Sequence, residues 1–227
     1  MKKLTKQQKR NLELIILASV VFFTILLWDS IVIFPIKIFT VLMHEVFHGL
    51  AAFFSGGKIV SIEVNAMLGG ECITEGGIAF VITSAGYLGS LLIGSLLFIS
   101  GYDKKVSLWV CTIISAILLL FTANYMKGVE GTIAALSYSV LLYISPRYFN
   151  KTVHLYLMKI FGLISCLYVV VDMKEDLLTL NYRMTDAQML SEITGVPAIL
   201  CAFIWIAISF VVIYFLFKQS YKKGISA

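Results

Sequence analysis

Residues 31–54 read IVIFPIKIFTVLMHEVFHGLAAFF, an apolar run that is long enough to cross a membrane as a helix. Within it, His44, Glu45 and His48 form an HExxH motif. Positions i and i+4 lie on one face of a helix, so both imidazoles can bind the same metal ion. Ionisable side chains are costly inside a membrane. This stretch therefore predicts a functional polar site on a membrane helix.

The residue types of the motif are those that bind zinc. Three protein ligands around Zn²⁺ leave a fourth position for water, and the metal lowers the pKa of that water from about 15.7 to about 7. We predict His44 and His48 as two of the ligands and Glu45 as the catalytic general base. The alternatives are an internally hydrogen-bonded polar cluster and a metal site that has lost its activity.

The composition of the whole chain is that of a membrane protein. Of the 227 residues, 59% are hydrophobic and only 14% are charged, and the mean hydropathy is +0.93. Soluble domains are about 45–50% apolar and about 25% charged. Because apolar spans take up most of the length, we expect a single integral membrane domain over residues 1–227. The net charge of +5 lies mainly in the termini and short loops, where it favours contact with the lipid bilayer and gives no sign of nucleic-acid binding.

Six apolar runs have the length of membrane helices. They cover residues 12–28, 31–54, 77–100, 106–124, 154–171 and 197–217. A seventh segment, 132–145, is short and could be a thin span, a re-entrant helix or half of a broken one. We therefore expect an all-α polytopic membrane protein with about six transmembrane helices.

Basic residues at the two ends of the chain predict its topology. They are Lys2, Lys3, Lys6, Lys9 and Arg10 before the first run, and Lys218, Lys222 and Lys223 after the last. By the positive-inside rule, both termini lie in the cytoplasm. That arrangement requires an even number of crossings, which favours six spans over seven. We expect a multi-pass protein of the cell membrane with a cytoplasmic N-terminus.

Residues 55–76 differ from the spans on either side. The stretch 58–65 alternates and is rich in Ile and Val, and glycine pairs lie at 56–57, 69–70 and 76–77. This pattern predicts a short β-hairpin after the HExxH helix. An unpaired strand edge cannot face lipid, so the hairpin should lie at the interface or in a protein cavity. Its edge could bind a substrate peptide as an added strand, or the hairpin could be a plain connection.

Three parts of the chain resemble the site-2 protease family of intramembrane zinc metallopeptidases. The first is HEVFHGLAAFFSGGKI at 44–59, and the second is SAGYLGS at 84–90, which is similar to a segment of the small bacterial and plant branch of that family. The third comprises DMKED at 172–176, TDA at 185–187 and TGVP at 194–197. The resemblance implies a zinc-dependent endopeptidase that cleaves a membrane protein substrate in or near the bilayer.

The resemblance also implies an aspartate on a later helix as the third zinc ligand. Family members carry it in an LDG pattern, which this chain lacks. We predict Asp172, because it ends the apolar run 155–171 and could reach the depth of the HExxH helix. Asp176, one helical turn further on, and Asp186 are the alternatives. Asp172 could also be an ordinary interfacial carboxylate.

Two hypotheses about function follow from these residues. The first is an active intramembrane zinc protease. The second is a non-proteolytic membrane protein that retains a zinc site for structure, sensing or the binding of a partner. Glu45 favours the enzyme, because a structural metal site needs ligands but no general base.

Overall fold

A computed structural model describes residues 4–178 and 185–225, and for residues 175–178 it describes the backbone alone. The helices are α1 (Lys6–Leu26), α2 (Phe34–Phe54), α3 (Ala79–Ser100), α4 (Lys104–Asn124), α5 (Val129–Tyr148), α6 (Lys151–Leu178), α7 (Asp186–Thr194) and α8 (Ala198–Lys223). The strands are β1 (Lys58–Val64), β2 (Gly70–Glu75) and β3 (Met126–Lys127).

By length and composition, five of the described helices can cross a membrane: α2, α3, α4, α8 and residues 151–174 of α6. The prediction of a polytopic, mainly helical membrane protein is thus confirmed, with five of the six proposed spans. The sixth, residues 12–28, falls largely in α1, which also contains the charged residues Lys9, Arg10 and Glu13. The short segment 132–145 belongs to α5, a helix of 20 residues.

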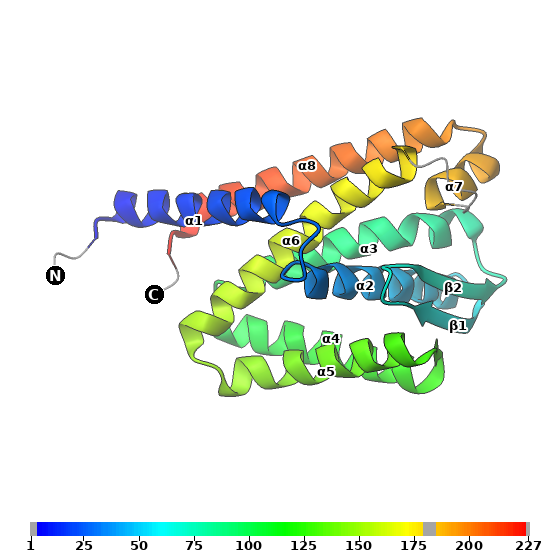
Figure 1. Cartoon of the computed structure of the whole chain (residues 1–227), viewed down its shortest axis with the longest axis horizontal. Helices are drawn as coiled ribbons and strands as arrows, with labels where there is room; N and C mark the ends of the chain where they lie inside the picture. The colour runs from blue at the N-terminus through cyan, green and yellow to red at the C-terminus, as the bar shows by residue number, and fades with distance from the viewer. Residues whose placement is uncertain (1–3, 179–184, 226–227) are drawn as a thin grey trace.

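The two termini lie at the same end of the bundle (Figure 1). Helices α1 and α2 run one after the other in the same direction, and the passes of α3, α4, α5, α6 and α8 then alternate. A hydrogen bond of 3.3 Å from Nε2 of Gln7 to the hydroxyl of Tyr221 joins the start of α1 to the end of α8. The two termini share an end because α1 and α2 run in the same direction and α5, which lies between α4 and α6 in the chain, runs along the bundle.

A buried ion pair attaches α1 to the bundle. Nζ of Lys159 lies 2.6 Å from Oε1 of Glu13, and neither side chain is exposed. The hydroxyls of Tyr102 and Tyr156 donate to the same carboxylate over 3.1 and 2.8 Å. Because each charge is paired and hydrogen-bonded, α1 can present a glutamate to the protein interior without leaving it unsatisfied.

The predicted hairpin is present and has a third strand beside it. β1 and β2 are antiparallel, with a register from Lys58 opposite Glu75 to Val64 opposite Gly70. β3 pairs with β1 in parallel, so the strand order is β2-β1-β3. In the turn, the side-chain oxygen of Asn65 accepts from two backbone amides, each at 3.0 Å. Among the described strands, β2 is therefore paired on one side and has an open edge.

Helix α2 lies in the middle of the molecule and positions the site. It packs against α3, α5, α6 and both strands of the hairpin. Its side chains Phe39, Leu42 and Val46 are completely buried. Because α2 is covered on nearly every side, the HExxH motif faces protein and a cavity.

Candidate metal centre

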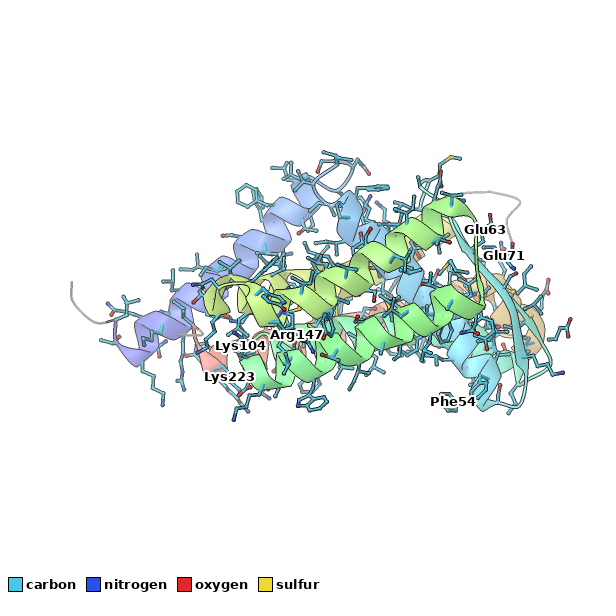
Figure 2. All side chains as sticks on the ribbon, turned by 90° about the horizontal axis from the view of Figure 1, so that it is seen from below. Phe54, Glu63, Glu71, Lys104, Arg147 and Lys223 are labelled. Atoms are coloured by element: carbon cyan, nitrogen blue, oxygen red, sulfur yellow. The ribbon has the colours of Figure 1, made fainter. Side chains whose placement is uncertain are left out.

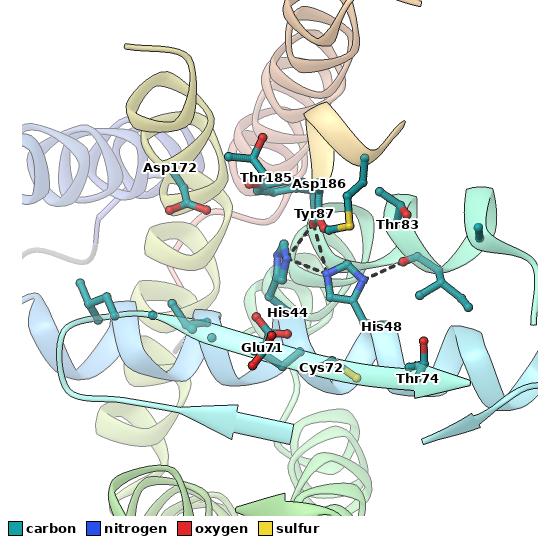
Figure 3. A pocket seen from close by; sticks show the side chains of 18 of the residues that line it. His44, His48, Glu71, Cys72, Thr74, Thr83, Tyr87, Asp172, Thr185 and Asp186 are labelled. Atoms are coloured by element: carbon teal, nitrogen blue, oxygen red, sulfur yellow. Dashed lines mark hydrogen bonds and ion pairs between the residues drawn. The ribbon is translucent and has the colours of Figure 1, made fainter. Parts of the chain in front are cut away.

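The HExxH motif lies in the second half of α2, where it is enclosed by other elements. Glu45 and His48 are buried, and His44 is half-buried. Pro35 lies in the first turn of the helix, where its missing amide hydrogen costs no intrahelical bond. Over the motif, α3 begins on one side and β2 passes on the other (Figure 3). This enclosure fixes the direction of all three side chains.

The backbone of α3 determines the tautomer of His48. Nδ1 of His48 lies 2.7 Å from the carbonyl oxygen of Ile82. A carbonyl can only accept a hydrogen bond, so Nδ1 of His48 carries a proton and Nε2 is the ring nitrogen left to face a metal ion. Metal-binding histidines commonly have such a bond on the other ring nitrogen, because it orients the ring. Nε2 of His48 points to Nε2 of His44, 2.9 Å away.

Asp186, the first residue of α7, completes a group of three. Its Oδ2 lies 2.9 Å from Nε2 of His44 and 3.1 Å from Nε2 of His48. Thr185 caps the helix by accepting from the amide of Gln188, whose side chain in turn accepts from the amide of Thr185. This capping box starts the helix at the residue that faces the histidines.

The charge state of Asp186 suits a metal ligand. Burial opposes ionisation of the carboxyl group, but His48 and His44 outweigh it and hold its pKa well below the usual range. Asp186 is therefore a carboxylate at neutral pH.

The structure brings His44, His48 and Asp186 together, and it does not bring Asp172 into this group. These three residues form the only His, Cys, Asp and Glu cluster with metal-binding spacing among the described residues. Asp172 lies further off on α6 and lines the same cavity (Figure 3). The geometry thus favours the alternative ligand, Asp186, over the predicted Asp172. The side chain of Asp176, the other alternative, lies outside the described residues.

Asp186 lies with the histidines because α7, the helix that follows α6, turns back toward the HExxH motif. Helix α7 packs against α3 and α8, and its first turn lies over the two histidines. Asp186 thereby reaches the histidines from outside the spans.

The three atoms fit a zinc ion. Tetrahedral zinc with ligands at about 2.0–2.1 Å separates its ligand atoms by about 3.3 Å, and the separations of 2.9–3.1 Å are slightly smaller. Among the described residues, Oδ2 of Asp186 is buried without a hydrogen-bond donor in suitable geometry. A cation between Oδ2 of Asp186 and the two Nε2 atoms would satisfy that oxygen, so the donor set fits the metal.

A cavity of about 1080 Å³ adjoins the three residues and makes them accessible. Its lining includes Glu45, the turn and strand around Gly70, and both Asp172 and Glu192. Glu45 lies directly against Gly70. A group bound between β2 and α7 would thus meet the histidines and the predicted general base at once.

Two contacts at the site were not predicted from the sequence. The ring of Tyr87 lies edge-on to His44, with the ring centroids 4.7 Å apart, and Trp205 lies behind it at 5.0 Å. Tyr87 was noted only as part of the segment 84–90. The Ile82 carbonyl is a backbone group, so no residue type in the sequence indicates its role.

The fold and the site together define a multi-pass membrane protein with a His-His-Asp centre beside a buried glutamate. A family model described as Peptidase M50B-like matches residues 16–216. The chain belongs to this family, which is site-2 protease-like, and the predicted resemblance is confirmed. The family indicates a membrane metallopeptidase. No curated protein and no solved structure matches the chain in the same comparisons.

Proposed function

We propose that the protein is a zinc-dependent intramembrane endopeptidase of the site-2 protease type, with His44, His48 and Asp186 as the zinc ligands. The observation that carries the proposal is the convergence of three ligand atoms, at separations of 2.9–3.1 Å, next to Glu45 in an accessible cavity. Membership of a metallopeptidase family supports it. When bound, zinc would supply Lewis-acid chemistry that polarises a scissile carbonyl and makes a water molecule more acidic.

The residues of the chain have distinct roles in this proposal. Glu45 accepts the proton of the attacking water and passes it to the leaving amine. The Ile82 carbonyl holds the ring of His48 in one orientation and one tautomer. Tyr87, packed between His44 and Trp205, restricts the ring of His44.

We further propose that the open edge of β2 holds the substrate. β2 passes beside the histidines, and its partner β1 lies on the far side of it (Figure 3). The cavity lining includes Gly70, Glu71, Cys72 and Thr74 of this strand. An extended segment of a membrane protein that pairs with β2 would run past the metal centre with its backbone exposed, whereas a helix hides its peptide bonds.

The Glu45→Gln variant tests the enzymatic role against a purely structural zinc site. Purified wild-type protein should contain about one zinc per chain. When co-expressed with a panel of single-span reporter proteins tagged at both ends, it should cleave at least one of them. The variant should keep its zinc and lose the cleavage, because Gln cannot accept the proton. Equal cleavage by the variant would refute the role of Glu45. Zinc binding without cleavage of any reporter by the wild type would favour the non-proteolytic alternative.

A further inference from the structure

Most of the described basic residues lie at the end of the bundle that carries both termini. They come from the start of α1, the α3–α4 turn, the α5–α6 turn and the end of α8. We call this group the basic end: Lys6, Lys9, Arg10, Lys104, Lys105, Arg147, Lys151, Lys218, Lys222 and Lys223.

Side-chain contacts show that these segments are neighbours. The hydroxyl of Tyr102, in the α3–α4 turn, is hydrogen-bonded to Oγ of Ser220 in α8 over 2.7 Å. Arg147, near the end of α5, donates from Nη2 to Oγ1 of Thr112 in α4 over 3.0 Å. Figure 2 shows Lys104, Lys223 and Arg147 toward the same end. The charge is thus concentrated by the fold, although the sequence distributes it along the whole chain.

The metal centre belongs to the opposite end. There the hairpin meets the start of α5, where Oε2 of Glu130 accepts from the amide of Ala66 over 2.6 Å. Figure 2 shows Glu63 and Glu71 at this end. Among the described residues, its cations are Lys58, Lys127 and Lys174, and its acidic side chains are Glu45, Glu63, Glu71, Glu75, Glu130, Asp172, Asp186 and Glu192.

The positive-inside rule applies well to this distribution. It counts Lys and Arg in short loops and close to the ends of spans, and it gives little weight to Asp and Glu. The α3–α4 and α5–α6 connections are very short, since α4 begins at Lys104 and α6 at Lys151, and both carry cations. We infer that the basic end is cytoplasmic and that the metal centre, with its cavity and hairpin, opens toward the extracytoplasmic face of the membrane.

This orientation narrows the substrate class of the proposed protease, and that step rests on the proposed function. The bond offered to Glu45 would lie at the extracytoplasmic end of a substrate's membrane segment. Cleavage would separate an extracytoplasmic portion of the substrate from the part that stays in the membrane. The substrates would be membrane proteins with an extended or easily unwound stretch at that end, because only an extended backbone can pair with β2.

Thiol labelling in intact cells tests the orientation without any need for zinc or hydrolysis. Cys111, Cys166 and Cys201 are buried and can stay in place, whereas the half-buried Cys72 is replaced by serine. One new cysteine is then introduced, either by Met67→Cys at the hairpin turn, where Met67 is 90% exposed, or by Gln7→Cys at the basic end, where Gln7 is also exposed. Both positions are on the surface, and the Gln7 change removes only exposed hydrogen bonds, to Asn11 and Tyr221.

A membrane-impermeant maleimide is applied to bacterial spheroplasts and to broken membranes. The Met67→Cys protein should be labelled in both preparations, and the Gln7→Cys protein only in broken membranes. The Cys72→Ser parent should remain unlabelled and serves as the control. Labelling of the Gln7 variant in intact spheroplasts, alone or together with the Met67 variant, would overturn the orientation. Since labelling is independent of catalysis, such a result would leave the proposed peptidase activity to its own test.

Discussion

Gly86 of α3 packs so closely on His44 of α2 that a Cβ atom at position 86 would collide with Nε2 of the histidine. The same atom would collide with Nε2 of His48. Only glycine fits at position 86, because the metal-binding edges of both imidazole rings occupy the space of a side chain.

The Gly86→Ala variant should lose zinc. The added methyl group has to push one or both imidazoles out of position, and displaced supporting contacts typically cost about 10–100-fold in metal affinity. Zinc content of the purified protein measures the effect. Leu88→Ala, which changes an exposed residue of the same helix, should keep its zinc. Equal zinc content in the wild type and the Gly86 variant would contradict the packing described here.

Asp186→Ala and Asp172→Ala should behave differently in the same measurement. Asp186 contributes an oxygen within 3.1 Å of both imidazole nitrogens, so its removal should lower zinc occupancy strongly. Asp172 lines the cavity outside the cluster, and its variant should retain about one zinc per chain. If Asp172→Ala lost its zinc and Asp186→Ala kept it, the third ligand would be Asp172 and the assignment of Asp186 would be wrong.

Gly70→Ala should impair catalysis while zinc stays bound. A Cβ atom at position 70 would collide with Oε1 of Glu45, so the carboxylate has to move. A general base displaced by about 1 Å can cost about 100-fold in rate. The reporter cleavage assay measures the loss of catalysis, and the zinc content of the purified protein shows whether the metal is retained. Val60→Ala, which changes an exposed residue of β1, is the matched control and should leave both unchanged. Wild-type cleavage by the Gly70 variant would argue against Glu45 as the base.

Lys159→Met should lower the free energy of unfolding by about 3–5 kcal/mol, because it leaves the charge of Glu13 buried without its partner. Denaturant titration of the detergent-solubilised protein measures it. The double variant Glu13→Gln, Lys159→Met removes both charges and should be less destabilised than the single one. If the double variant were less stable than Lys159→Met, the attraction between the two charges would exceed the cost of removing them from water.

The sequence predicts the parts of this fold that depend on local pattern. The run 31–54 indicates a membrane helix with two histidines on one face, and the alternation at 58–65 between glycine pairs indicates a hairpin. Helix α5 was only partly predicted. Polar residues such as Thr132 and Ser139 and the internal Pro146 lower its apolar character, yet Oγ of Ser139 donates to a backbone carbonyl of α4 and is buried. Such pairing satisfies polar groups that a hydropathy pattern counts as unfavourable.

The position of Asp186 depends on tertiary structure. Asp172 is attractive in the sequence because it ends an apolar run, whereas Asp186 follows a break in that run and belongs to a short helix. Only the return of α7 over α3 brings Asp186 to the histidines, and no spacing rule relates residues 44 and 186. The contacts of Gly70 and Gly86 with the motif are equally non-local.

The placement of Asp186 on α7 has a consequence for the order of events during biosynthesis. With the proposed ligands, α2 supplies two of them early in translation, and the third appears only after α6 has been made and α7 follows it. A nascent chain that has inserted its first helices would hold zinc weakly, since two imidazoles are an incomplete set. Hydrolytic competence would then begin only when nearly the whole chain is in the membrane, and unfinished chains would be harmless to neighbouring proteins at the site of insertion.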